Sequence, residues 1–189
     1  MKRILVAIAI ASCLMMAPAM PCWAEGRSDL DRLLKTKECI KCNLNGAVLP
    51  GVDLSGANLT DSKLKGANLR GANLSGAVFM QSDLNGADLR GANLSGADMS
   101  WSEMNEANLN NADLTNANLA MCHLRKAAMY EASLRGANLR GADLAGADLR
   151  KADLRNISRL GMWIRNTDLS GAIWVDGRVC APDSISRCR

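Results

Sequence analysis

The 189-residue sequence lacks the motifs on which enzyme chemistry usually rests. It has no glycine-rich phosphate loop, no Ser-His-Asp set and no cluster of metal ligands at a familiar spacing, and its single histidine is His123. Net charge is also small, since 23 basic and 19 acidic side chains leave a formal charge of +4. We therefore expect no catalytic residues, no cofactor and no metal, and binding to nucleic acid through charge alone is disfavoured.

Only the N-terminus carries a long hydrophobic run, from Ile4 to Ala17. Lys2 and Arg3 precede the run, and prolines and small residues follow it. The run is too short to span a bilayer, and this order of segments predicts a secretory signal peptide over residues 1–24. We expect cleavage after Ala24, with Ala19 as the alternative.

Export affects how the cysteines are interpreted. Removal of residues 1–24 leaves five of the seven cysteines and lowers the formal charge from +4 to +2. The mature chain would be periplasmic or secreted, with no transmembrane segment, in an oxidising compartment. The run Ile10-Ala11-Ser12-Cys13 resembles a lipoprotein box and offers an alternative, lipid anchoring at Cys13.

From Leu44 to Trp174, one position in every five is apolar. Of the 27 positions in this register, 20 are Leu and only Arg159 is polar. The residue two places earlier is usually small, and it is Ala in 18 of the 27 cases. A five-residue period fits neither an α-helix nor a plain strand. The consensus A(N/D)LxG, unbroken in 66–74 and 136–149, therefore indicates a repeat architecture.

This repeat resembles the pentapeptide repeat family over residues 39–176. The resemblance implies an all-β fold, a right-handed quadrilateral β-helix with four pentapeptides in each coil. Each Leu and the small residue two places before it would point inward, and the other three residues outward. Alternating Leu and Ala would fill a narrow tube at core density. About seven coils at the strand spacing would make a rod roughly 32 Å long.

The segments outside the repeat are expected to cap its two ends, where an open β-edge would expose unpaired backbone groups. Ser28-Asp29 followed by Leu30, Leu33 and Leu34 predicts a short amphipathic helix over the N-terminal end. The predicted organisation after the signal peptide is an N-terminal capping segment at 25–41, the β-helix at 42–176 and a C-terminal cap at 177–189.

Arg159 falls at an inward position of the repeat. Burial of an unpaired charge is costly. We therefore expect the wall to bulge or break near Ile157–Trp163 and the pattern to resume at Asp168.

The cysteines allow several interpretations. Cys39 and Cys42 form a CxxC that is typical of a structural disulfide or a pair of buried thiols, with a redox-active pair or half of a metal site as alternatives. Cys180 and Cys188 are close enough in sequence to form a disulfide that closes the C-terminal cap. Cys122 lies four coils, or about 19 Å, from Cys42, which predicts a buried free thiol.

Two groups of outward positions stand out when the chain is arranged in rows of twenty. Val78, Met80, Trp101 and Met121 place apolar side chains where the consensus has polar residues or Gly. They predict a patch that binds a protein partner or a second copy of the chain; the alternative is that these side chains lie flat and only shield the coil. The second group is a column of Asp83, Glu103, His123 and Asp143, which would favour a protonated histidine, bind a divalent cation weakly, or form only a solvated surface.

These observations favour a non-catalytic repeat scaffold or protein–protein interaction module in the bacterial cell envelope. Two alternatives follow from the family and from the CxxC. The first is mimicry of duplex DNA to bind a topoisomerase, which in the family is cytosolic and depends on a strongly negative surface. The second is a thiol redox protein that uses Cys39 and Cys42.

Overall fold

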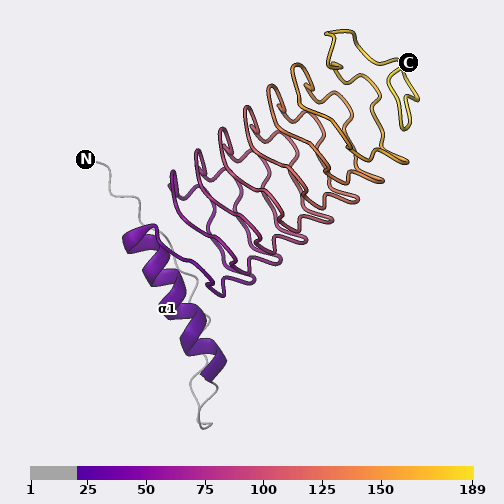
Figure 1. Ribbon diagram of the computed structural model, residues 1–189. Helices are drawn as coiled ribbons and strands as arrows, with labels where there is room; N and C mark the ends of the chain where they lie inside the picture. The colour runs from indigo at the N-terminus through magenta and orange to yellow at the C-terminus, as the bar shows by residue number, and fades with distance from the viewer. Residues whose placement is uncertain (1–20) are drawn as a thin grey trace.

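The computed structural model describes residues 21–189, which form one helix followed by a rod of stacked coils (Figure 1). Helix α1 spans Pro21–Thr36 and lies beside the first coil, while the C-terminus lies at the far end of the rod. The predicted features of residues 1–20, including lipid anchoring at Cys13, lie outside the described residues.

The rod is held together by parallel bridges between residues twenty apart. These run without a shift from Glu38↔Asn58 to Asp153↔Ile173. Each coil supplies one bridge residue on each of four walls, as at Asn43, Val48, Asp53 and Asn58. Four pentapeptides therefore complete one turn, and the predicted four-sided β-helix is confirmed. Within residues 21–189, no strand extends beyond a single bridge residue.

The interior consists of the two inward positions of each repeat. Leu69 and Ala72 are fully buried, and the same holds for their equivalents in nearly every coil. The corners adopt the left-handed conformation even where the residue is not Gly, as at Trp101 with φ 64° and Asn111 with φ 58°. That conformation turns the chain through each corner, so residues twenty apart lie above one another along the rod.

One inward column is polar and bonds to the corners of the coils. The hydroxyl of Ser62 donates to the carbonyl of Cys39 at 2.5 Å, and Ser82 donates to Leu59 at 2.7 Å. The thiol of Cys122 makes the equivalent bond to Met99 at 2.8 Å. This column therefore satisfies backbone carbonyls inside an otherwise apolar core.

Helix α1 covers the N-terminal end of the core, but it begins before Ser28. The side chain of Asp29 is not a cap, because Oδ2 accepts a hydrogen bond at 2.8 Å from the N–H of Asn43 in the first coil. Leu33 is fully buried against the core, whereas Leu34 is 49% exposed. The helix ends where Lys37 takes φ 57° and donates its N–H to the carbonyl of Leu33 at 2.9 Å, a left-handed C-terminal cap.

The C-terminal cap folds back over part of the last coil. Its antiparallel bridges join Asp168 to Ile185 and Ile173 to Val179. The predicted disulfide between Cys180 and Cys188 closes the cap, with a Cα–Cα distance of 4.8 Å.

The predicted break near Ile157–Trp163 is wrong. The register continues through Asn138↔Ser158 and Asp143↔Trp163 without an inserted residue. Arg159 lies in the last full coil and is exposed, with its guanidinium carbon 5.9 Å from the ring centroid of Trp174. Because no further coil covers that position, the charge reaches solvent through the end of the rod and the wall needs no bulge.

Candidate binding site

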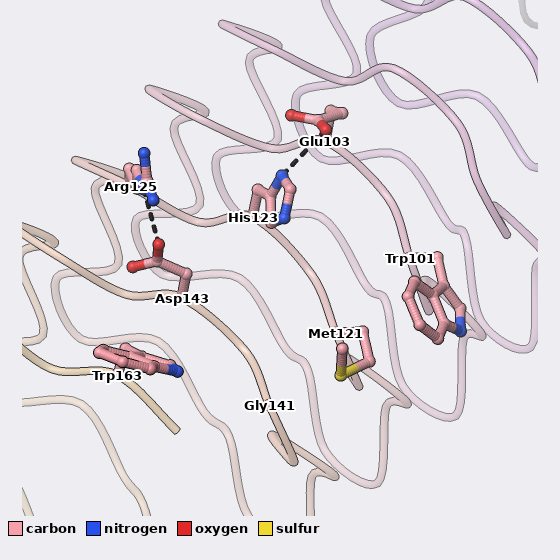
Figure 2. A pocket seen from close by; sticks show the side chains of 8 residues that line it. All are labelled: Trp101, Glu103, Met121, His123, Arg125, Gly141, Asp143 and Trp163. Carbon is pink, nitrogen blue, oxygen red and sulfur yellow. Dashed lines mark hydrogen bonds and ion pairs between the residues drawn. The ribbon is translucent and has the colours of Figure 1, made fainter. Parts of the chain in front are cut away.

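A groove crosses the coils between residues 101 and 163, with a volume of about 480 Å³ (Figure 2). One side is the corner column of Trp101, Met121 and Gly141, and the other is the neighbouring wall column. Each column places residues twenty apart side by side, because the register does not shift. The wall column consists of Glu103, His123, Asp143 and Trp163. Arg125, two residues after His123, completes the lining.

Two exposed indoles bound this groove. Trp101 is 58% exposed and Trp163 is 65% exposed. Between them Gly141 adds no side chain, and the side chain of Met121 lies over it, so that a Cβ at position 141 would overlap the Met121 sulfur. The hollow therefore exists because the corner column changes from Trp to Met to Gly along the rod.

The polar side of the groove consists of a hydrogen-bonded histidine–glutamate pair and an arginine–aspartate ion pair, drawn as dashed lines in Figure 2. His123 Nδ1 lies 2.9 Å from Glu103 Oε1, and Arg125 Nε donates to Asp143 Oδ2 at 2.6 Å. Burial opposes ionisation of Asp143, yet its pKa lies below the usual value because the Ala145 N–H and Arg125 donate hydrogen bonds to it. These contacts hold the polar groups in place beside the indoles.

A second hollow adjoins the first and shares Arg125, Asp143 and Trp163 with it. Its other lining residues include Lys126 and Arg165. Arg125 is paired with Asp143 and Lys126 with Glu106 at 3.6 Å, so Arg165 is the cationic lining residue without an acidic partner among the described residues. This end of the groove carries a net positive charge.

The predicted apolar patch divides between two surfaces. Trp101 and Met121 line the groove, Met121 being 41% exposed. Val78 and Met80 do not line it; Val78 is half-buried on another wall between Asn58 and Asp98, and Met80 is 37% exposed. Sequence reasoning missed Trp163, because the expected break removed it from the column of Glu103, His123 and Asp143.

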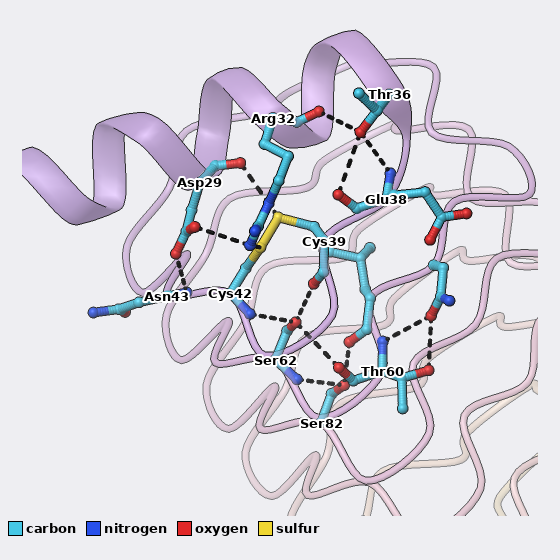
Figure 3. Close-up of a disulfide and its surroundings, with 12 residues drawn as sticks. Asp29, Arg32, Thr36, Glu38, Cys39, Cys42, Asn43, Thr60, Ser62 and Ser82 are labelled. Atoms are coloured by element: carbon cyan, nitrogen blue, oxygen red, sulfur yellow. Dashed lines mark hydrogen bonds and ion pairs between the residues drawn. A yellow bond between two sulfur atoms is a disulfide. The ribbon is translucent and has the colours of Figure 1, made fainter.

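The CxxC forms a disulfide between Cys39 and Cys42, which lies beneath α1 (Figure 3). Both residues are buried, and Arg32 Nη2 lies 2.7 Å from the Cys42 sulfur. Thiol–disulfide exchange requires access to a sulfur. The arrangement therefore joins the helix to the first coil and gives no support to the redox alternative.

Three further ion pairs join an arginine to a nearby aspartate. Arg90, Arg150 and Arg155 each bond the Asp two residues earlier, at 2.5 to 2.7 Å. These hydrogen bonds lower the pKa values of the partners, which are Asp88, Asp148 and Asp153. A duplex-DNA mimic needs unpaired negative charge, and the carboxylates of Asp88, Asp148 and Asp153 do not supply it.

Two further classes of site are not seen in residues 21–189. No group of three or more potential metal ligands comes together in this part of the chain, and the column of Asp83, Glu103, His123 and Asp143 forms no such cluster. No helix in the same residues has the length and apolar character needed to cross a membrane.

The fold and the groove together define a β-solenoid repeat protein with an open surface site. The sequence profile described as Pentapeptide repeats matches segments 38–76, 62–100, 82–120, 92–129 and 117–156, which together cover more than half of the chain. The chain belongs to the pentapeptide repeat family. Proteins of this family are generally non-catalytic scaffolds.

Several crystal structures of pentapeptide repeat proteins are similar to this chain. Rfr23 from the cyanobacterium Cyanothece 51142 is 29% identical over 78% of this chain and 98% of its own, with a TM-score of 0.46. The protein alr5209 from Nostoc PCC 7120 is 24% identical over 75% and 94%, with a TM-score of 0.35. A protein of the Arabidopsis thaliana thylakoid lumen is 39% identical over 57% and 65%, with a TM-score of 0.23. A comparison with curated sequences finds no match.

Proposed function

We propose that this chain is a non-catalytic binding module that acts outside the bacterial cytoplasm, in the periplasm or after secretion. Its working surface is the groove between Trp101 and Trp163. The observation that carries the proposal is the exposure of two indoles in one hollow of a wall that is otherwise polar. Large apolar side chains gathered at one exposed site are typical of an interaction surface.

Rigidity supports the same function. The lining residues stand on coils whose backbone hydrogen bonds continue to the coil before and the coil after, as in the chain of bridges from Glu103 through His123 to Asp143. Side chains on such a scaffold hold their relative positions without a ligand. A preorganised site binds at a lower entropic cost than a flexible one.

Export is supported by the N-terminal pattern of Lys2, Arg3 and the apolar run, and by the two disulfides. Fractionation of cells that express the full chain tests this part. We expect intact mass in the periplasm or medium to show loss of residues 1–24 and both disulfides. A full-length cytosolic species with free thiols would contradict it.

The binding surface is tested by a photo-crosslinking amino acid at position 101 in native cells. The matched control is position 111, which lies ten residues along the same coil with the same corner conformation. We expect covalent adducts, whether with protein or with other envelope polymers, at position 101 and not at 111. Equal capture at both positions, or none at either, would overturn the assignment of the groove.

A further inference from the structure

The groove combines indole faces with hydrogen-bonding groups that are held in place but only partly used. Among the tryptophans whose side chains the structure describes, Trp101 and Trp163 line it and Trp174 is buried at 8% exposure. Trp101 and Trp163 belong to coils three turns apart, which places them about 14 Å from each other along the rod. That distance is the span of a short run of sugar rings.

The polar wall offers donors and acceptors between the two indoles. His123 uses Nδ1 for Glu103, and its Nε2 makes no bond to the described residues. Arg125 uses Nε for Asp143, so its terminal nitrogens are left for a ligand. Because a hydroxyl both donates and accepts, alternating carboxylates and nitrogen donors suit a polyhydroxylated ligand.

Other ligand classes fit this surface less well. A peptide strand cannot add to the wall here, because the wall residues are already bridged to the coils on either side, as His123 is to Glu103 and Asp143. Acyl chains would desolvate the Glu103–His123 and Arg125–Asp143 pairs and offer their polar groups no hydrogen bonds in place of water.

We propose that the groove binds an oligosaccharide, with sugar rings stacked on Trp101 and Trp163 and hydroxyls bonded to the Glu103–His123 and Arg125–Asp143 pairs. This inference rests on the proposed function and names its ligand. Arg165 lines the adjoining hollow and has no acidic partner among the described residues, because Arg125 is paired with Asp143 and Lys126 with Glu106. This unpaired cation adds a preference for saccharides that carry carboxylates.

The test uses the exported chain with both disulfides and two linear tetrasaccharides as probes. One is neutral, the β-1,4-linked tetramer of N-acetylglucosamine, and the other is acidic, the hyaluronan tetrasaccharide. Binding is followed by calorimetry and by the indole N–H signals in nitrogen-15 NMR. We expect the signals of Trp101 and Trp163 to shift together while that of Trp174 stays in place. The acidic probe should bind several-fold more tightly, and Arg165→Ala should remove that difference.

Variants locate the site. Trp101→Ala and Trp163→Ala should each weaken binding about tenfold or more, because each removes a stacking platform. Trp101→Phe should recover part of the loss, and Met80→Ala, outside the groove, should have no effect. Absence of indole shifts at millimolar concentrations of both probes would overturn the proposal. Shifts that persist in both alanine variants would overturn it equally.

The outcomes separate this inference from the proposed function. A protein captured at position 101, with no response to either saccharide, would leave the binding module standing and make the ligand a protein. Indole shifts that depend on protein concentration without any sugar would assign the groove to a second copy of the chain. Both results would contradict the saccharide proposal.

Discussion

The side chain of Met121 lies across Gly141 in the following coil, where a Cβ would overlap its sulfur. Gly141 has φ 68°, the corner conformation that Met121 adopts one coil earlier and Trp101 two coils earlier. The backbone thus tolerates side chains at this corner, and Gly141 is distinguished by the neighbour that occupies its space. The Met121 side chain therefore shields part of the coil, and it forms the bottom of the groove.

Replacement of Gly141 by Ala tests this contact. We expect the Met121 side chain to move into the groove, with a loss of stability of about 1–2 kcal/mol from the left-handed backbone and a further increment from the displaced contact. The matched control is Gly96→Ala, which has φ 65° at a corner with nothing within 4 Å of the added Cβ. Thermal unfolding and the Met121 methyl signal in carbon-13 NMR measure the two effects. Equal destabilisation with an unmoved methyl would show that the contact has no consequence.

The thiol of Cys122 provides a second prediction. Burial raises the pKa of this thiol to about 11, so almost no thiolate forms near neutral pH. We expect iodoacetamide to leave Cys122 unmodified in the folded, disulfide-intact chain and to react with it rapidly in denaturant. Intact mass against time measures this difference. Rapid modification of the native chain would mean that the core opens frequently at this coil.

The polar inward column that contains Ser62, Ser82 and Cys122 suggests which substitution Cys122 should accept best. Ser62 and Ser82 make the same bond to a carbonyl 23 residues earlier that the Cys122 thiol makes to Met99. Cys122→Ser should therefore retain the bond and change the unfolding temperature little. Cys122→Ala leaves the carbonyl with one bond fewer and should cost about 1 kcal/mol. A larger loss for Ser than for Ala would contradict the role assigned to this column.

The sequence predicts the interior of this fold well because each inward position has one environment throughout the rod. A Leu such as Leu69 meets equivalent neighbours above and below, so the five-residue period translates directly into burial and register. The buried state of Cys122 followed from the same regularity. The ends are different, since a residue there loses one neighbouring coil. Arg159 is accommodated because no further coil covers it. The repeat pattern alone does not show that the rod ends there.

The groove was only partly predictable. Trp101 and Met121 share a corner column that twenty-residue rows reveal, but Val78 belongs to another wall with polar neighbours above and below it. Trp163 could be placed in the groove only if the register continues past Arg159. The register does continue, because the guanidinium of Arg159 leaves the core beside the ring of Trp174. The direction of the Met121 side chain depends on space above Gly141, which is a property of packing and not of period.

Acid should weaken the rod through the Asp–Arg pairs. Hydrogen bonds from the arginines two residues later hold the pKa values of Asp148 and Asp153 below their unfolded values. A lowered folded-state pKa stabilises the fold above about pH 4, where the unfolded carboxyl is ionised, and this contribution is lost as pH falls through the folded value. We therefore expect the unfolding temperature to hold between pH 7 and 5 and to fall below about pH 4.

Asparagine at both positions tests the cause of this acid dependence. Asn occupies the equivalent outward positions at Asn68 and Asn108, so Asp148→Asn together with Asp153→Asn should keep the turn geometry. The double variant should unfold at a slightly lower temperature at pH 7 and show a shallower decline in acid, the effect being modest because solvent screens these pairs. If the unfolding temperature of the double variant declined with falling pH as steeply as that of the wild type, other carboxyl groups would be the cause.

The disulfide of the C-terminal cap should protect one end of the rod selectively. Residues of the closed loop bond the last coil, since the N–H of Gly171 donates to Cys180 at 2.9 Å and that of Leu169 to Ser184 at 2.9 Å. Loop closure of this length contributes about 2–3 kcal/mol by limiting the unfolded chain. Replacement of Cys180 and Cys188 by Ser should therefore accelerate amide hydrogen exchange at Leu169 and Gly171. In a solenoid each coil contacts only its neighbours, so the amide of Leu89, four coils away, should exchange as before; faster exchange there would show that the rod unfolds as one cooperative unit.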